Sequence, residues 1–570
     1  MRRALQSLLV LSLALAGLSA TAQPGPASFP VTITIDAAQT RGDLAPVWRF
    51  FGADEPNYAT MKDGRKLIEH LGALKPGEVY FRAHNLLTSG DGTPAFKWGS
   101  TNAYTETKDG KPVYNWTIVD HIIDTYRAQG IHPYLEVGFM PEALSSAPTG
   151  TPYQHSWRPG FAYNLISTGW AYPPKDYKKW AELIYQWTRH NVQRYGRAEV
   201  EKWYFEVWNE ANIPDYWKGT PEEFFKLHDY AVDAIKRALP TARVGGPDVA
   251  GSARPGKDES FQVVMRGFLD HVVHGRNYAT GKIGTPVDFL SFHAKGAPVF
   301  VDGHVRMGIS THLRAADNGF ERVAAVPELA KKPIVIGESD PEGCAACPGP
   351  QNAYRNGTVY SSYTAATLAR LWELARKRGV NLEGVLTWAF TFENQPWFPG
   401  YRQLATNGID QPVMNLFRQL AKLGPTQLVS TSSAEVPLDK IMADGVREAP
   451  DVSAIATRAA DGHLALLAWH YHDDDVPGPD AAVQFNLDGL GGDGARKVTL
   501  WRVDSTHANA FTAWKALGSP LAVNADQYKQ LEAASELKPE SGRELTVRGG
   551  KATLEVTLPR QGTVLIEIGS

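Results

Sequence analysis

Eight short apolar runs, each followed by an amphipathic stretch, alternate along most of the chain and constrain its fold more than any other feature. Alternating strand-like and helix-like patterns are typical of repeated βα units, whose strands lie parallel in one sheet. Each run has the length of a strand and is rich in β-branched or aromatic residues. The eight predicted strands are residues 47–52, 78–83, 132–138, 203–209, 242–246, 287–293, 333–337 and 384–390.

Helical patterns fill the intervals between these runs. One helix start is marked at Thr220 by an N-cap residue, a proline in the first helical position and two early glutamates. Eight strands that each precede a helix are what a (β/α)₈ TIM barrel requires, and we predict this α/β fold for residues 46–423. A doubly wound open sheet is the alternative. It is disfavoured because no G-x-G-x-x-G pattern follows the first strand.

The pattern changes after residue 423, where strand-like runs are separated by Asp-Gly, Gly-Gly and Pro-Gly pairs. This is typical of a β-sandwich, so we predict an accessory β-sandwich domain over residues 424–570. A chain of 570 residues exceeds the size at which one hydrophobic core stops growing, which agrees with two domains. Residues 31–35 alternate cleanly, and we expect the segment 23–45 to add a strand to the accessory domain.

The N-terminus has the pattern of a targeting segment. Arg2 and Arg3 precede an apolar stretch over residues 8–18, and a small-x-small pattern follows at residues 20–22. We therefore expect residues 1–22 to be a signal peptide and the mature chain to be exported to the periplasm or outside the cell. An uncleaved anchor is the alternative. No other apolar run approaches the ~20 residues that a membrane span needs, so we expect no membrane association after cleavage.

The only two cysteines, Cys344 and Cys347, have C-x-x-C spacing. In an exported protein this spacing favours a small loop-closing disulfide. A structural zinc site would need two further ligands, and none is paired nearby, so no metal is expected. A thioredoxin-like centre is disfavoured because prolines and a glycine flank the pair and do not open a helix.

Charge and composition narrow the class of substrate. The 58 basic and 61 acidic side chains give a formal charge of −3 without any long run of one sign. This argues against nucleic-acid or membrane-surface partners and favours a neutral substrate. Aromatic residues form 11% of the chain and include 16 tryptophans. Stacking on sugar rings would use them, and core packing is an equally good explanation.

In a TIM barrel the catalytic residues lie at the C-terminal ends of the strands. The fourth predicted strand ends in Asn209 and Glu210, and the seventh is followed at once by Glu338. Two glutamates facing each other across the barrel mouth are the pair that glycoside hydrolysis needs. We assign Glu338 as the nucleophile, which Arg82 would hold ionised, and Glu210 as the acid/base, whose protonated form its neighbours would favour. Asn209 would donate a hydrogen bond to a sugar 2-hydroxyl.

Other strand ends supply candidate sugar contacts. They are His84 on the second strand, Phe139 on the third, His293 on the sixth, and Trp388 with Glu393 on the eighth. The alternative for the histidines is a buried, hydrogen-bonded core position, and for Trp388 it is core packing. A strand-end glutamate such as Glu210 can also cap the following helix. Glu206 closes no strand and is expected to be structural, and the set requires no metal or organic cofactor.

These motifs resemble glycoside hydrolase family 39, which contains β-xylosidases and α-L-iduronidases. The motifs that carry the resemblance are residues 51–57, Arg82-Ala83-His84, residues 136–141, residues 205–212 and Phe292-His293. The resemblance implies Glu210 as acid/base and Glu338 as nucleophile, and it implies five sugar contacts: His84, Asn209, His293, Trp388 and Glu393. The chain departs from the pattern at Lys295, where many members carry tyrosine, and at the cysteine pair.

The resemblance predicts an exo-acting, retaining β-xylosidase that releases xylose from the non-reducing ends of xylo-oligosaccharides. α-L-Arabinosidase activity and an endo-acting hydrolase are the alternatives within enzymes. A carbohydrate-binding protein without turnover is the alternative from another class, and the presence of both Glu210 and Glu338 disfavours it. The expected partner is an oligosaccharide substrate, and the sequence does not indicate an oligomeric state.

Overall fold

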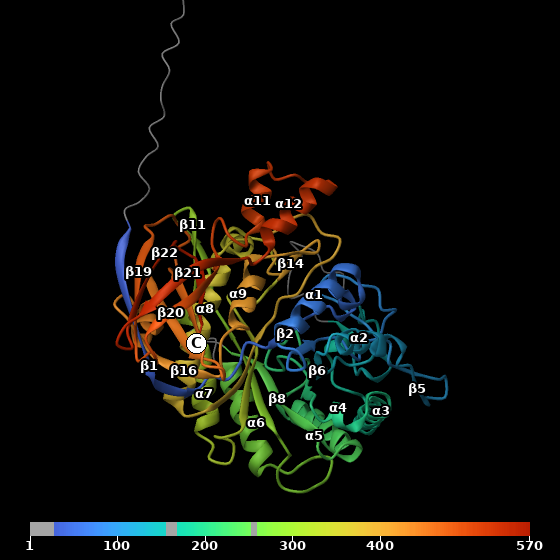
Figure 1. Ribbon diagram of the computed structural model, residues 1–570. Helices are drawn as coiled ribbons and strands as arrows, with labels where there is room; N and C mark the ends of the chain where they lie inside the picture. The colour runs from blue at the N-terminus through green and yellow to red at the C-terminus, as the bar shows by residue number, and fades with distance from the viewer. Residues whose placement is uncertain (1–27, 155–167, 252–258, 570) are drawn as a thin grey trace, which may run out of the picture.

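The structure is a computed structural model that describes residues 28–154, 168–251 and 259–569. Figure 1 shows a barrel wrapped by helices, coloured blue to yellow, beside a sheet-rich part in orange and red. The predicted signal peptide, residues 1–22, lies outside the described residues. Within the described part of the chain, no helix is long and apolar enough to cross a membrane.

Eight parallel strands close into a barrel and follow one another around it in chain order. All eight predicted strands are present, so the barrel prediction is confirmed. Most observed boundaries differ from the predicted ones by a few residues, because the ladder hydrogen bonds set the ends and the apolar pattern does not. The barrel strands are β2 (Phe50–Ala53), β3 (Tyr80–Ala83), β6 (His132–Val137), β7 (Tyr204–Val207), β8 (Arg243–Ala250), β9 (Phe289–Lys295), β12 (Pro333–Asp340) and β13 (Asn381–Thr387).

A helix follows each barrel strand and covers the outside of the barrel (Figure 1). The start of α5 shows how the sequence fixes such an element. Thr220 accepts a hydrogen bond from the Glu223 backbone N–H, and the Glu223 side chain accepts one from Thr220, which forms a complete capping box. The covering helices are α1 (Lys62–Leu74), α2 (Thr117–Ala128), α3 (Tyr177–Tyr195), α5 (Pro221–Ala238), α6 (Glu259–His274), α7 (Ile309–Ala324), α8 (Val359–Arg378) and α9 (Pro412–Leu420).

The barrel interior is filled by stacked aromatic side chains. The Phe50 ring stacks on Tyr80 with centroids 4.8 Å apart, and Tyr134 stacks on Tyr204 at 5.0 Å. These rings belong to one buried cluster with Phe289 and other barrel residues. The barrel is therefore a packed core and not a pore, which leaves the C-terminal ends of its strands as the place for a site.

The second domain is built on one nine-stranded sheet. Its strand β1 comes from the start of the described chain and pairs antiparallel with β16 and parallel with β19. The sheet curls around an apolar core until its edge strands contact each other, which gives the expected sandwich. In sheet order the strands are β21 (Pro539–Val547), β20 (Gly494–Val503), β23 (Thr563–Ile568), β18 (Leu464–Tyr471), β17 (Asp451–Arg458), β16 (Thr426–Ser432), β1 (Phe29–Asp43), β19 (Ala481–Asp488) and β22 (Ala552–Leu558).

Two helices of the second domain reach over to the barrel. α11 (Ala510–Ala516) and α12 (Ala525–Ser535) lie between β20 and β21 in the chain and stand apart from the sheet in Figure 1. They pack on the loop that follows β13, where the Phe398 ring lies 5.4 Å from Phe511 and 5.3 Å from Trp514. Only strands were predicted in this region from the sequence. These contacts brace the loop that begins with Trp388.

Several short elements complete the described structure, and each lies in a loop of the barrel or beside the sheet. They are η1 (Pro56–Thr60), β4 (Tyr104–Glu106), β5 (Pro112–Tyr114), η2 (Glu142–Leu144), η4 (Gly169–Ala171), α4 (Arg197–Val200), β10 (Val299–Val301), β11 (His304–Arg306), η5 (Pro350–Asn356), β14 (Ala405–Thr406), β15 (Ile409–Asp410) and α10 (Leu438–Asp444).

Candidate active site

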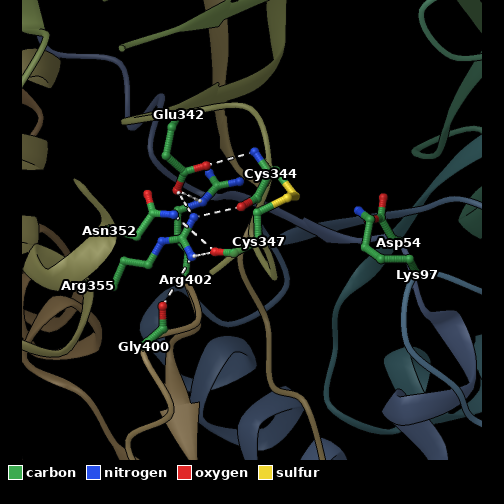
Figure 2. Close-up of a disulfide and its surroundings, with 9 residues drawn as sticks. All are labelled: Asp54, Lys97, Glu342, Cys344, Cys347, Asn352, Arg355, Gly400 and Arg402. Atoms are coloured by element: carbon green, nitrogen blue, oxygen red, sulfur yellow. Dashed lines mark hydrogen bonds and ion pairs between the residues drawn. A yellow bond between two sulfur atoms is a disulfide. The ribbon is translucent and has the colours of Figure 1, made fainter. Parts of the chain in front are cut away.

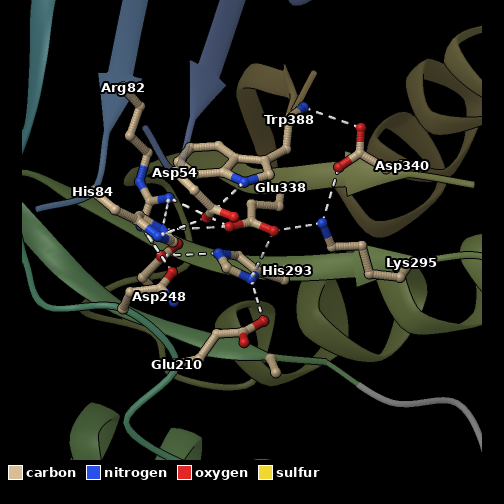
Figure 3. A network of polar contacts seen from close by, with 12 residues as sticks. Asp54, Arg82, His84, Glu210, Asp248, His293, Lys295, Glu338, Asp340 and Trp388 are labelled. Atoms are coloured by element: carbon tan, nitrogen blue, oxygen red, sulfur yellow. Dashed lines mark hydrogen bonds and ion pairs between the residues drawn. The ribbon is translucent and has the colours of Figure 1, made fainter. Parts of the chain in front are cut away.

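Glu210 and Glu338 meet at the C-terminal end of the barrel, as Figure 3 shows. Glu210 follows β7, and Glu338 lies in the last part of β12. One carboxylate oxygen of each glutamate and one nitrogen of His293 all lie within 4.8 Å of one another. The two side chains that the sequence placed on strands four and seven are therefore neighbours.

The backbone around the pair is held in uncommon conformations. Trp208 and Glu210 have φ angles of 71° and 46°, in the left-handed region that costs free energy for residues other than glycine. The Glu210 N–H donates to the Asp248 carbonyl at 2.9 Å, which fixes the turn. Gly337 leaves room for the same neighbour, since a Cβ there would lie 2.1 Å from Asp248 Oδ1. Such strain is typical of functional sites.

Four cationic groups surround the Glu338 carboxylate. Lys295 Nζ is the nearest, at 2.5 Å from Oε2, and Arg82 Nη1 lies 3.6 Å from Oε1. Burial alone would raise the pKa of Glu338, but Lys295, His293 and His84 outweigh it and hold the pKa well below its usual range. The sequence predicted Arg82 as the residue that holds Glu338 ionised. In the structure Lys295 lies closer to the Glu338 carboxylate than Arg82 does.

His293 connects Glu210 to a buried ion cluster of Arg82, Glu136, Glu206 and Asp248, which we call the floor of the site. Its Nδ1 lies 2.7 Å from Glu210 Oε1, and its Nε2 lies 2.9 Å from Asp248 Oδ2. Burial opposes the charged form, yet the surrounding carboxylates raise the pKa of His293 to about 10. The imidazolium therefore donates to both partners and orients the Glu210 carboxylate.

Arg82 is fully buried at the centre of the floor. It contacts Asp248, and its Nε donates to Glu206 at 2.5 Å while Nη2 lies 3.0 Å from Glu136. Burial would lower the pKa of Arg82, but these carboxylates raise it well above its usual value. Burial raises the pKa of Glu206 to about 7 despite the arginine. Glu206, which was expected to be structural, belongs to this ion cluster.

Asn209 lies beside Arg82 with one polar group unused. Its Oδ1 accepts from Arg82 Nη2 at 3.2 Å, which orients the side-chain amide. Its buried Nδ2 has no hydrogen-bond partner among the residues that the structure describes. A buried donor without a partner is costly, so a ligand hydroxyl is the natural acceptor for it.

His84 and Trp388 form the wall of the site next to Glu338. His84 Nδ1 lies 2.9 Å from Asp54 and Nε2 lies 2.9 Å from Glu136, and the carboxylates raise its pKa to about 9 although burial opposes this. The Trp388 ring lies 4.4 Å from the His84 ring. Trp388 depends on Gly52, because a Cβ there would lie 2.3 Å from the indole. The two rings are tilted by 40° and pack against each other.

Phe139 joins this wall through ring contacts, with its centroid 5.5 Å from His84 and 4.4 Å from Trp170. A small cavity of about 10 Å³ lies here, and it is lined by Asp54, His84, Asn85, Lys97, Phe139, Trp170 and Tyr216. Glu393 is placed differently. Its two oxygens accept from the backbone N–H groups of Asp63 and Gly64 at 2.9 and 3.1 Å, so it caps α1. Its role as a sugar contact stays a prediction.

The loop after β12 is closed by a disulfide between Cys344 and Cys347 (Figure 2). Arg355 donates to both cysteine carbonyls, at 2.6 and 2.9 Å. The Cys344 N–H donates to Glu342 at 2.8 Å, and Arg402 Nε lies 2.9 Å from the same side chain. The disulfide loop is therefore connected to the ion pairs that follow Glu338 along the chain.

Comparison with known proteins identifies the family. The sequence pattern of the family described as Glycosyl hydrolases family 39 matches residues 31–552. The chain belongs to glycoside hydrolase family 39. It is therefore a glycosidase, and the resemblance seen in its motifs is confirmed.

Relatives of this family 39 glycosidase span its whole length. It is 27% identical over 548 residues to a β-xylosidase of Caldicellulosiruptor saccharolyticus, covering 94% of this chain and 98% of that one. It is 26% identical to human α-L-iduronidase, covering 97% and 81%. The crystal structure of a monomeric β-xylosidase from Caulobacter crescentus CB15 superposes with a TM-score of 0.71 at 24% identity, covering 94% and 99%, which shows the same fold.

Sequence reasoning missed several residues of the site. Asp54 and Asp248 lie at the ends of the first and fifth barrel strands, so the rule that found Glu210 would have found them if applied there. Asp340 lies two residues after Glu338 and shares its face of β12. Lys97 contacts Asp54 from a loop, where no periodic pattern marks a residue as buried.

Glu210, His293 and Glu338 are also the one group, among the described residues, whose ligand atoms converge enough for a metal ion. Their protein partners argue against that use. Both His293 nitrogens already engage carboxylates, and Lys295 contacts Glu338. A metal-bound histidine would need an unprotonated nitrogen. The three residues fit the chemistry of a family 39 glycosidase instead.

Proposed function

We propose that this family 39 enzyme is a retaining, exo-acting β-xylosidase that releases xylose from the non-reducing ends of xylo-oligosaccharides by double displacement. One observation carries the retaining mechanism, namely that carboxylate oxygens of Glu210 and Glu338 lie within 4.8 Å of each other. Retaining enzymes place their carboxyl groups about 5–5.5 Å apart, whereas inverting enzymes need about 6.5–9.5 Å to admit a water.

In the first displacement the ionised Glu338 attacks the anomeric carbon, and Glu210 gives its proton to the leaving oxygen. A covalent glycosyl-enzyme and a free alcohol result. In the second displacement Glu210 takes a proton from water, whose oxygen attacks the anomeric carbon and releases Glu338. The Nδ2 of Asn209, which has no hydrogen-bond partner among the described residues, donates to the sugar 2-hydroxyl, and this bond strengthens as the oxocarbenium-like state forms.

The aromatic side chains around the site support a neutral sugar as the substrate. Trp388 and His84 bring two aromatic rings together with centroids 4.4 Å apart, and such rings are the side chains on which sugars stack. The β-xylosidase relatives add weight to xylose. An α-L-arabinopyranoside shares this stereochemistry and is the nearest alternative glycone.

A uronic acid glycone is a second candidate, because two lysine ammonium groups lie in the site. A sugar carboxylate needs such a cation, and the human relative is an α-L-iduronidase. Lys295, however, is engaged by Glu338 and Asp340, and Lys97 contacts Asp54. These existing ion pairs are the reason that we favour the neutral pentose.

Hydrolysis of nitrophenyl glycosides tests the proposal. The wild type is given β-xyloside, α-L-arabinoside and α-L-iduronide, and we expect the xyloside to be cleaved with the highest kcat/KM. Preference for the iduronide would replace xylose by the uronic acid. Failure on all three would refute the assignment of the glycone.

Variants test the mechanism. Glu338→Ala and Glu210→Ala should each lose activity by about 10³-fold or more, because each removes one partner of the reaction. Azide should rescue Glu210→Ala and give a β-glycosyl azide, the product of two inversions. An α-azide from that variant would refute retention. Glu448→Ala is the control, because its side chain is 80% exposed and should leave activity unchanged.

We also propose that residues 1–22 direct export of the enzyme to the periplasm or beyond. The charged start, apolar core and small-x-small pattern at residues 20–22 support this. Fractionation of producing cells, with N-terminal sequencing of the protein recovered, tests it. A mature chain that starts at Gln23 is expected, and intact protein in the cytoplasm would contradict the proposal.

A further inference from the structure

We propose that Asp340 is a positioning residue that holds the Lys295 ammonium against the nucleophile Glu338. The inference rests on the proposed function, since it takes Glu338 to be the nucleophile of a glycosidase. It concerns Lys295, the cation nearest to Glu338.

The register of two neighbouring strands creates the arrangement. β12 pairs with β9 so that Glu338 lies opposite His293 and Asp340 lies opposite Lys295. Glu338 and Asp340 are two residues apart on one strand, so their side chains point to the same face. Lys295 Nζ lies between them, 2.5 Å from Glu338 Oε2 and 2.9 Å from Asp340 Oδ2, as Figure 3 shows.

Asp340 is itself fixed from the other side. Its Oδ1 accepts from the Trp388 backbone N–H at 3.0 Å and lies 2.6 Å from Arg402 Nη1. Asp340 and Arg402 are completely buried, and Lys295 is 13% exposed. Arg402 in turn pairs with Glu342 of the disulfide loop. The carboxylate that restrains the lysine therefore has almost no freedom to move.

Lys295 is one of several charges that face Glu338, and it is the nearest. The charged groups around Glu338 are Arg82 and His84 from β3 and its end, Lys97 from the following loop, Glu210 after β7, Asp248 from β8, His293 and Lys295 from β9, and Asp340 from β12. Nitrogen atoms of Arg82, His84 and His293 lie 3.6 Å or more from the carboxylate oxygens. Loss of the 2.5 Å contact with Lys295 should therefore raise the pKa of Glu338 more than loss of any of these longer contacts.

A four-carbon side chain with a free ammonium has many rotamers, so a lysine alone would sample several partners. Asp340 removes that freedom because its Oδ2 offers the Lys295 ammonium a second acceptor beside Glu338 Oε2. Its own negative charge works in the opposite direction, because an anion near Glu338 disfavours ionisation. Asp340 consequently helps the nucleophile only through Lys295, and this makes the effect of its removal distinctive.

The pH dependence of kcat/KM is the kinetic test, since its acidic limb reports the ionisation of the nucleophile in the free enzyme. Lys295→Met should move this limb upward by about 1–3 pH units, the effect of one close opposite charge. Asp340→Asn should move it upward as well. The double variant should show no upward shift beyond that of Lys295→Met, and Lys295→Arg should restore a limb close to that of the wild type.

Two controls separate positioning from other effects. Asp439→Asn breaks an exposed Lys377–Asp439 ion pair of 2.8 Å and should leave the profile unchanged. If Asp340 acted only by its charge, Asp340→Asn would move the acidic limb downward. A downward shift, or a double variant in which the two single shifts add, would overturn the proposal.

A crystal structure of Asp340→Asn decides the same point without a substrate. We expect Lys295 Nζ to leave its 2.5 Å contact with Glu338, because a neutral amide at position 340 cannot hold the ammonium as the carboxylate does. An unchanged contact overturns the proposal. If the wild type cleaves none of the glycosides, the proposed function fails, while the position of Lys295 in this crystal structure still tests the role of Asp340.

Discussion

Replacing Arg82 by methionine should destabilise the barrel more than any other single charge removal in the site. The guanidinium is fully buried and is shared by Glu206 at 2.5 Å, Glu136 at 3.0 Å, Glu338 at 3.6 Å and the contacting Asp248. Methionine keeps much of the side-chain volume and removes the charge. The carboxylates would then be buried together without their common cation.

The magnitude follows from the geometry. At an effective dielectric constant of about 20, two unit charges 3 Å apart interact by about 5–6 kcal/mol. Full loss of three such contacts would exceed the whole stability of a typical domain, about 5–15 kcal/mol, so the carboxylates must take up protons instead. Because proton uptake removes part of the repulsion, we expect Arg82→Met to lower the free energy of unfolding by about 3–5 kcal/mol near neutral pH.

The sign of the pH dependence provides a second check. Burial already raises the pKa of Glu206 to about 7, and removing Arg82 raises it further. A carboxyl with a raised pKa in the folded state contributes stability at acid pH that is lost as pH rises through that value. The penalty of Arg82→Met should therefore be smaller at pH 5.5 than at pH 8, by about 1.4 kcal/mol per pH unit and group.

Urea denaturation followed by tryptophan fluorescence, at both pH values, measures this difference. Arg197→Met is the matched control, because Arg197 is 61% exposed and its ion pair with Glu201 lies on the surface. We expect no measurable shift in its transition. An Arg82→Met penalty that equals the control, or that grows on acidification, would refute the reasoning.

Three further predictions follow from single contacts. Asn209→Ala should lower kcat on the xyloside by about 10²-fold, since it removes a donor that acts in the transition state, with steady-state kinetics as the measure. Reducing the Cys344–Cys347 disulfide should lower the unfolding free energy by about 2 kcal/mol, measured with and without dithiothreitol. Glu393→Gln should weaken the cap of α1 by about 0.5–1 kcal/mol, seen as faster amide exchange there.

The fold could be predicted from sequence because its pattern is repeated. Eight apolar runs with helical intervals leave few arrangements other than a closed barrel, and the structure has all eight strands. The helices α11 and α12 were missed for a physical reason. α11 has only seven residues, and both helices are stabilised by packing on a distant loop that holds Phe398. Local pattern carries no signal for such tertiary contacts.

Site residues could be predicted from the sequence where they lie at the ends of barrel strands. They could not be predicted where tertiary packing determines the position of a side chain. Glu210, Glu338 and His293 all follow from the rule that strand ends face the barrel mouth. Glu393 lies after the eighth strand as well, yet its carboxylate turns to the N-terminus of α1. Lys97 comes from an irregular loop. No spacing along the chain reveals that it contacts a carboxylate in the site.

The lysine at position 295 determines the kind of interaction that Glu338 receives from its neighbour on β9. A hydroxyl group would donate a hydrogen bond to the ionised Glu338 without bringing a positive charge, whereas the ammonium adds an ion pair to the hydrogen bond. In the proposed mechanism the same charge would stabilise the carboxylate of Glu338 when the second displacement releases it, so Lys295 would act on both steps of the reaction. Such a cation is useful only if it stays beside the nucleophile, and the buried Asp340 keeps it there.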